Sequence, residues 1–152
     1  MSKHFWNSLS IAISVFFDEN EVHYTIFSTA CISDNNELIN LLIEFTKIDP
    51  SAKNNFAIRY TSEKGHIAVV DRLLQEPKNR VDSSADINYA IRVASKNGHI
   101  AVVERLLQDR RVDPSAVNNF AIRYASHNGH IAIMDRLLQD GQVKSGFICR
   151  QQ

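Results

Sequence analysis

The sequence lacks any surplus of charge and is poor in glycine and proline. Lysine plus arginine and aspartate plus glutamate number 17 each, so the formal net charge is zero. Nucleic-acid-binding domains normally carry a basic excess, because neutralising phosphates supplies most of their non-specific affinity. We therefore expect no nucleic-acid partner. Five glycines and three prolines exclude collagen-like and low-complexity chains, and the 44% hydrophobic fraction argues against intrinsic disorder.

Cysteines and long apolar runs are also scarce. Cys31 and Cys149 lie far apart and form no C-x-x-C pair, which excludes a disulfide framework and a cysteine-based zinc site. We interpret them as reduced thiols and expect a cytoplasmic protein. The nearest candidate for a membrane span, residues 9–17, is shorter than the roughly 18 residues that a span needs, and no small-residue cleavage site follows it. We expect neither secretion nor a membrane partner.

What the sequence does contain is an internal repeat. The segment NNFAIRYTSEKGHIAVVDRLLQ from Asn54 recurs as INYAIRVASKNGHIAVVERLLQ from Ile87 and as NNFAIRYASHNGHIAIMDRLLQ from Asn118. The distance is 33 residues from Gly65 to Gly98 and 31 from Gly98 to Gly129. The two extra residues lie after Gln75 and read as a loop insertion. A fixed period in this range predicts an array of stacked structural units.

The repeat frame divides the chain into four units with a flanking segment at each end. The clear units are 49–81, 82–112 and 113–143, and 18–48 is a degenerate unit in which Asp34-Asn35 replaces Gly-His. Residues 1–17 have helical apolar spacing, and their polar face lacks basic residues, so we expect an N-terminal cap helix rather than a membrane-surface helix. Residues 144–152 form a C-terminal stub, too short for another unit.

Each unit reads as two helices joined by a turn. Asn55 or Asn119 is a candidate N-cap of the first helix, because its side-chain oxygen can accept a first-turn N–H. Glycine ends that helix, since it tolerates a left-handed C-cap. Apolar residues then recur at helical spacing through the second helix. The histidines in the turns would stand one unit apart, too far to share a metal ion, so we interpret them as hydrogen-bond partners of the turn backbone. The structural turn residues are Gly65, His66, Gly98, His99, Gly129 and His130.

A helix, a Gly-His turn, a second helix and a Val-Asp connection at this period resemble the ankyrin repeat. The resemblance covers residues 49–143 strongly and residues 18–48 weakly. It implies an all-α solenoid of stacked helix-turn-helix repeats. Phe56-Ala57-Ile58-Arg59 stands where ankyrin repeats carry Thr-Pro-Leu-His, so the Thr–His hydrogen bond of that turn cannot form. The connecting segment 113–119 is also shorter than the usual β-hairpin finger of the family, so we expect short or absent fingers. The Asn-x-Ala-Ile-Arg pattern is similar to that of ankyrin-like arrays of giant viruses and amoeboid protists.

The resemblance implies a non-enzymatic protein–protein interaction scaffold, which binds an unidentified protein through the concave surface of its first helices and turns. No nucleotide-binding, hydrolase or zinc-protease motif is present, so we expect no catalysis, cofactor or metal. The arginines either contact an acidic partner or pair within the array, and the tyrosines either contact a partner or pack between units. The candidate partner-binding residues are Arg59, Tyr60, Glu63, Lys64, Asp86, Arg92, Lys96, Val117, Arg123, Tyr124 and His127.

A competing hypothesis makes the chain a structural or assembly module, such as a fragment of a longer array. The unit 113–143 keeps the apolar residues of the internal units, although too little sequence follows it to form another unit. That end would then be incompletely capped and would self-associate. The sequence therefore predicts either a monomer or weak self-association.

Overall fold

A computed structural model describes residues 19–46, 48–75 and 81–140 of the chain. The predicted cap helix (1–17), the loop insertion (76–80) and the C-terminal stub (144–152) lie outside the described residues. Within the described ranges the chain forms helices and no strand. The helices are α2 (Glu19–Ile32), α3 (Asn36–Phe45), α4 (Ala52–Lys64), α5 (Ile67–Leu74), α6 (Ala85–Asn97), α7 (Ile100–Leu106), α8 (Ala116–His127) and α9 (Ile131–Gln139).

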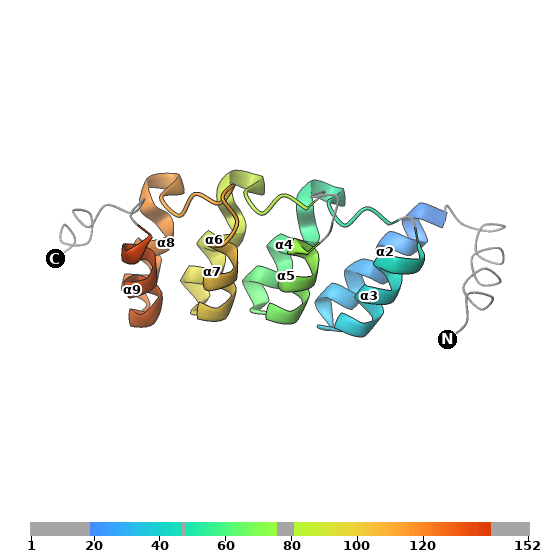
Figure 1. The fold of residues 1–152 in the computed structure, drawn as a ribbon, viewed down its shortest axis with the longest axis horizontal. Helices are drawn as coiled ribbons and strands as arrows, with labels where there is room; N and C mark the ends of the chain where they lie inside the picture. The colour runs from blue at the N-terminus through green and yellow to red at the C-terminus, as the bar shows by residue number, and fades with distance from the viewer. Residues whose placement is uncertain (1–18, 47, 76–80, 141–152) are drawn as a thin grey trace.

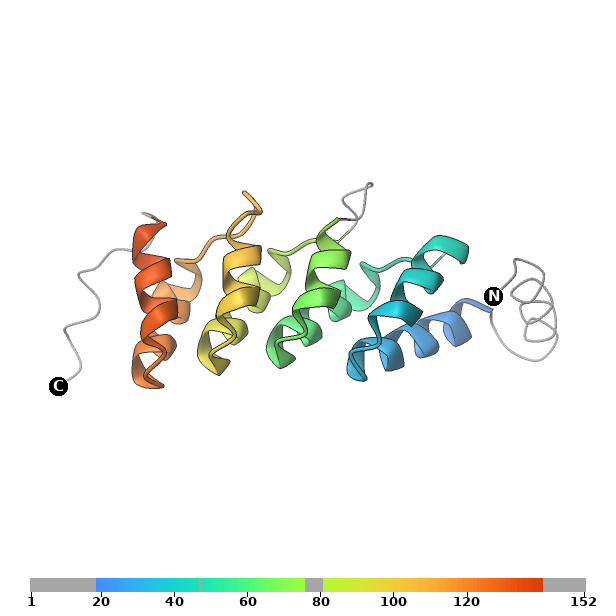
Figure 2. The same ribbon diagram turned by 60° about the horizontal axis from the view of Figure 1, so that its bottom comes forward.

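The helices stack as pairs in two layers. The described residues form four such pairs. Figure 1 shows them following one another along the long axis, from α2 and α3 at one end to α8 and α9 at the other. In Figure 2 the second helices α3, α5, α7 and α9 lie side by side in front of the first helices α2, α4, α6 and α8. Each helix contacts its partner within the pair and the corresponding helix of the next pair. The prediction of an all-α helical repeat solenoid is confirmed.

The core runs continuously through the stack. The second helices contribute large apolar side chains, such as Val69, Val70 and Leu73 of α5. The first helices α4, α6 and α8 each contribute an isoleucine among small residues, such as Ile58 beside Ala57. These side chains belong to one buried cluster that extends through every described pair. Burying a side chain of this size contributes about 1.5–3 kcal/mol, so stacking on neighbours supplies most of the stability of each pair.

Glycine ends the first helices as the sequence predicts. Gly65 and Gly98 cap α4 and α6 at φ values of 79° and 85°. Gly129 has a φ of 75° and follows Asn128, the C-cap of α8. In each case the backbone enters the left-handed region, which glycine adopts without the steric cost of a Cβ atom.

The beginnings of the first helices differ from the prediction. The helical segments of α4, α6 and α8 start at Ala52, Ala85 and Ala116, after Ser51, Ser84 and Ser115. In each helix the second to fourth residues then have positive φ values near 55°, so one left-handed turn precedes the right-handed helix. We call these three stretches the left-handed segments; they are residues 53–55, 86–88 and 117–119. Asparagine tolerates this conformation better than most residues.

The predicted N-cap role of Asn55 and Asn119 is wrong. Both asparagines lie inside left-handed segments, and Ser51 and Ser115 precede their helices as N-cap residues. The Oδ1 atom of Asn55 instead accepts the backbone N–H of Asp82 in the following unit, at 2.7 Å. Asn119 Oδ1 is buried and has no hydrogen-bond partner among the described residues. Asn55 therefore joins its unit to the next one.

Candidate interaction surface

The first helices present a band of aromatic and charged side chains away from the core. In α4 the buried residues Ala57, Ile58 and Thr61 occupy one side of the helix, and partly or fully exposed residues occupy the other. The same division follows in α6 and α8 because the sequence repeats. We call this surface the first-helix face. It comprises Phe56, Arg59, Tyr60, Glu63, Lys64, Asp86, Tyr89, Arg92, Lys96, Val117, Phe120, Arg123, Tyr124 and His127.

The three arginines of the first-helix face hold the left-handed segments in place. Arg59 Nη1 donates to the carbonyl oxygen of Asn54 at 3.3 Å. Arg92 Nη2 donates to that of Asp86 at 3.1 Å, and Arg123 Nη1 reaches that of Asn118 at 3.5 Å. Each guanidinium is therefore positioned by the backbone of its own unit.

Aromatic rings separate these arginines. The guanidinium carbon of Arg59 lies 4.9 Å from the ring centre of Tyr89. The guanidinium carbon of Arg92 lies 5.7 Å from the Tyr89 ring centre and 5.3 Å from that of Phe120. Cation–π contacts of this kind contribute about 0.5–2 kcal/mol, depending on exposure. The arrangement makes a ladder of alternating rings and cations that crosses from α4 to α8.

Tyr89 is a member of this ladder that the sequence reasoning did not single out. Its hydroxyl donates to Glu63 Oε2 at 3.0 Å, across the boundary between two units. Burial raises the pKa of the Tyr89 hydroxyl, and the Glu63 hydrogen bond and charge raise it further. The sequence does mark this position, because Tyr89 stands where the other two clear units have phenylalanine, Phe56 and Phe120.

Tyr60 and Tyr124 are half-buried on the first-helix face. The Tyr60 ring stacks on Phe56 of its own helix at a centroid distance of 5.5 Å, and the Tyr124 ring stacks on Phe120 at 4.0 Å. Lysine ammonium groups lie over both rings, at 5.5 Å for Lys64 on Tyr60 and 5.7 Å for Lys96 on Tyr124. Both tyrosines thus contact neighbours and still present surface to solvent.

Ion pairing is uneven along the surface. On α4, Arg59 lies 3.3 Å from Asp86 of α6 and Lys64 lies 3.4 Å from Glu63. Arg92, Lys96 and Arg123, on α6 and α8, have no carboxylate within ion-pair distance among the described residues. The sequence leaves open whether Arg59, Arg92 and Arg123 pair within the array or contact an acidic partner. Of these three arginines, only Arg59 forms an ion pair with a described residue.

The turn residues connect consecutive units. His99 Nε2 lies 2.9 Å from the carbonyl oxygen of Glu63, and His130 Nε2 lies 3.0 Å from that of Lys96. The imidazoles also cover the glycines of the preceding unit, so that a Cβ atom on Gly65 or Gly98 would lie 2.5 Å or 2.7 Å from the ring. His66 contacts the preceding unit in a related way, with Nδ1 at 3.1 Å from the carbonyl oxygen of Cys31. These hydrogen bonds run between units rather than within the turn.

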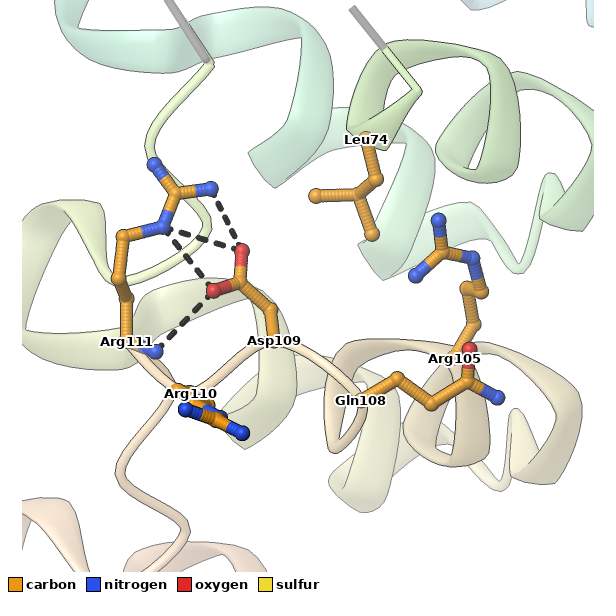
Figure 3. A pocket seen from close by; sticks show the side chains of 6 residues that line it. All are labelled: Leu74, Arg105, Gln108, Asp109, Arg110 and Arg111. Carbon is orange, nitrogen blue, oxygen red and sulfur yellow. Dashed lines mark hydrogen bonds and ion pairs between the residues drawn. The ribbon is translucent and has the colours of Figure 1, made fainter.

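A second candidate site is a hollow of about 490 Å³ lined by Leu74, Arg105, Gln108, Asp109, Arg110 and Arg111. Figure 3 shows Arg111 and Asp109 facing each other across one side of it. Arg111 Nη2 donates to Asp109 Oδ2 at 2.6 Å, and this bond lowers the pKa of Asp109 to about 2. Arg105 Nε donates to Asp71 Oδ1 at 2.6 Å. Of the three arginines that line the hollow, Arg105 and Arg111 are therefore already neutralised, which weakens its attraction to an anion.

Neither a metal-binding cluster nor a membrane-spanning helix occurs among the described residues. No group of three or more histidine, cysteine, aspartate or glutamate residues in these ranges lies close enough to hold a metal ion. None of the helices in the same ranges is both long and apolar enough to cross a membrane.

Comparison with known proteins identifies the class of repeat. The family model of the ankyrin repeat matches residues 86–119, which run from the left-handed segment of α6 through α7 to that of α8. The match has the length of about one unit of the array. The match confirms the predicted ankyrin repeat over these residues, and the stacked helix pairs of the described chain are consistent with an ankyrin repeat protein. No curated protein and no solved structure matches the chain.

Proposed function

We propose that the chain is a non-enzymatic scaffold that binds a protein partner through its first-helix face. Ankyrin repeats generally act as protein–protein interaction modules, and the match at residues 86–119 supports that general role. The observation that carries the choice of surface is the ladder of rings and cations across α4, α6 and α8. Tyrosine and arginine are enriched among the residues that dominate binding energy at interfaces, and both are held here by neighbouring side chains.

Sequence variation between the units supports the same surface. The positions occupied by Lys53, Asp86 and Val117 differ in charge from unit to unit, although the residues around them repeat. The second helices instead repeat an acidic residue followed by arginine, and Asp71 and Arg105 pair across two of those helices. A surface that varies on a repeated framework is suited to recognition of one partner.

The test is capture of a partner by the full chain from its native cell, followed by mass spectrometry, with variants on both helix layers. Tyr60→Ala combined with Tyr124→Ala should abolish capture and leave the helical circular dichroism signal intact. The matched control is Glu104→Ala with Asp135→Ala, which changes exposed residues of the second helices α7 and α9. Unchanged capture by the tyrosine variant would contradict the proposal, and loss of its helical signal would assign the tyrosines to the core.

A second candidate function is assembly through the outer end of the unit 113–143. One buried oxygen at this end, Asn119 Oδ1, has no hydrogen-bond partner among the described residues. A Cβ atom on Gly129 would meet no described residue within 4 Å, and Ile131 is 70% exposed. These features match the surface on which an internal unit would receive the next one.

Light scattering of the full chain over a range of concentrations tests this second function. Self-association through the outer end predicts a mass that rises with concentration and falls back to the monomer mass in Ile131→Glu, because a buried unpaired carboxylate is costly. A constant monomer mass at all concentrations would contradict assembly and leave the scaffold as the proposed function.

A further inference from the structure

Positive charge on the first-helix face is concentrated at one end. Helices α6 and α8 carry Arg92, Lys96 and Arg123, and their one acidic residue is Asp86. The Asp86 carboxylate lies 3.3 Å from Arg59 of α4, so it is already paired. The equivalent position of the next unit is Val117, which offers no carboxylate to Arg92. Because valine stands at position 117, where the preceding unit has aspartate, the cations at the α6–α8 end of the face are not neutralised.

The guanidinium of Arg92 is preorganised by its contacts with neighbouring residues. It lies between the rings of Tyr89 and Phe120, and its Nη2 donates to the Asp86 carbonyl oxygen at 3.1 Å. Its Nε is buried and has no hydrogen-bond partner among the described residues. A side chain that is already fixed loses little further rotamer entropy when it binds, and a guanidinium matches the geometry of a carboxylate.

Arg123 repeats the backbone contact of Arg92 one unit further on. Its Nη1 reaches the Asn118 carbonyl oxygen at 3.5 Å, and it has no ion pair among the described residues. The neighbouring rings of Phe120 and Tyr124 stack at a centroid distance of 4.0 Å. Lys96 lies over the Tyr124 ring at 5.7 Å. Three cations and two stacked rings therefore share one side of α6 and α8.

We propose that the partner contacts this end of the first-helix face with an acidic peptide segment, whose aspartate or glutamate carboxylates pair with Arg92 and Arg123. This inference rests on the proposed scaffold function and adds the chemistry of the partner. The flanking rings supply apolar surface for the carbon atoms of the same segment. Charge-assisted hydrogen bonds from arginine to carboxylate are about twice as strong as neutral ones, so the two pairs set the preference for acidic sequences.

The experiment selects binders from an unbiased library. A phage-displayed library of random 12-residue peptides is enriched on the immobilised full chain and counter-selected on Arg92→Gln/Arg123→Gln. The enriched peptides should be rich in aspartate and glutamate. A synthetic copy of one should bind the wild type in a fluorescence anisotropy assay and lose at least about tenfold in affinity with the Arg92→Gln/Arg123→Gln variant.

Two controls separate specific pairing from general electrostatics and from misfolding. Arg110→Gln/Arg136→Gln removes the same charge outside the first-helix face and should change affinity by less than about twofold, because solvent and salt screen distant charges. A peptide with every aspartate and glutamate changed to its amide should lose at least about tenfold in affinity for the wild type. That comparison needs no protein variant, so it decides the proposal even if Arg92→Gln/Arg123→Gln fails to fold.

The outcomes distinguish this inference from the function on which it rests. Enriched peptides without acidic residues, or an amidated peptide that binds equally well, would overturn the acidic segment and leave the scaffold standing. Failure to enrich any peptide, combined with no captured protein, would contradict both. Tight binding of a single-stranded oligonucleotide that displaces the peptide would overturn the choice of a peptide partner.

Discussion

The units 82–112 and 113–143 have nearly the same sequence and different surroundings. Asn88 Oδ1 accepts the backbone N–H of Asp113 at 2.7 Å, whereas Asn119 Oδ1 has no partner among the described residues. A Cβ atom on Gly98 would lie 2.7 Å from the His130 ring, whereas one on Gly129 would meet no atom of the described part of the chain within 4 Å. The comparison teaches that the energetic role of a repeated residue depends on the unit that follows it, as expected where neighbouring units supply the stability.

The ends of the two units also differ, here through partners that belong to the same unit. Asp109 accepts hydrogen bonds from Arg111 of the same loop and from Ser83, at 2.6 Å and 2.7 Å. Asp140 occupies the equivalent position, but Pro114 replaces Ser83 and its Oδ1 has no partner among the described residues. Matched substitutions in the two units therefore separate the effect of the residue from the effect of its neighbours.

The largest difference is expected between Gly98→Ala and Gly129→Ala. Both variants place a Cβ atom at a positive φ, which costs about 1–2 kcal/mol. Gly98→Ala also forces the His130 ring to move, and overpacking of this kind adds about 1–3 kcal/mol. Urea unfolding followed by circular dichroism should show a free-energy loss about twice as large for Gly98→Ala. Equal losses would show that His130 does not pack on Gly98.

The next difference is expected between Asn88→Ala and Asn119→Ala. Both variants replace an asparagine in the left-handed conformation, which alanine tolerates less well. This cost is the same in both and cancels when their free energies of unfolding are compared. Asn88→Ala alone leaves the Asp113 N–H without its partner, which costs about 1–2 kcal/mol. The free energies of unfolding of the two variants should differ by that amount. A difference near zero would show that the hydrogen bond between Asn88 and Asp113 does not stabilise the chain.

Asp109 should make the stability of the array depend on pH. Its pKa of about 2 in the folded chain lies below the ordinary value of 3.8, chiefly because of the Arg111 hydrogen bond. Its contribution is therefore complete above about pH 4 and is lost as the pH falls towards 2. Because solvent screens the pair, we expect about 1 kcal/mol.

Thermal unfolding from pH 5 to pH 2 checks this expectation by comparing the wild type with Asp109→Asn. The difference in stability between the two should shrink as the pH falls. Asp140→Asn is the matched control and should leave the stability at pH 5 nearly unchanged, because Asp140 Oδ1 has no partner to lose among the described residues. A difference between wild type and Asp109→Asn that stays constant down to pH 2 would contradict the role of the carboxylate.

The smallest effect is a gain in stability. Ile87 adopts a φ of 54° and is 66% exposed, and the equivalent residue of the next unit is Asn118. Ile87→Asn should stabilise the chain by about 0.5–1 kcal/mol, because asparagine tolerates the left-handed region and little apolar surface becomes newly exposed. A higher melting temperature in differential scanning calorimetry is the expected result. A lower one would mean that Ile87 contributes packing that outweighs its strain.

The sequence predicts the helix pairs and their turns because both depend on local chemistry. Apolar spacing and the position of Gly65 relative to His66 are visible within a single unit. The role of Asn88 is not, because the N–H that it binds lies 25 residues further on. An asparagine before an apolar stripe has the pattern of an N-cap, and the left-handed segment that redirects its side chain has no local signature.

The candidate surface could be predicted only in part. The arginines and tyrosines follow from comparing the units, and so does the change from Asp86 to Val117. Which cations are neutralised depends on contacts between helices, such as the one that joins Arg59 to Asp86. Tyr89 was missed for the same reason, since its neighbours Arg59 and Glu63 belong to the preceding unit.

Mapping of the bound peptide by nuclear magnetic resonance tests the central claim most directly. The isotope-labelled full chain is titrated with the selected acidic peptide, and changes in backbone amide shifts are followed. Binding on the first-helix face predicts the largest changes in α6 and α8, around Arg92, Lys96 and Tyr124. Changes confined to the second helices α5, α7 and α9, or to the outer end near Ile131, would contradict it.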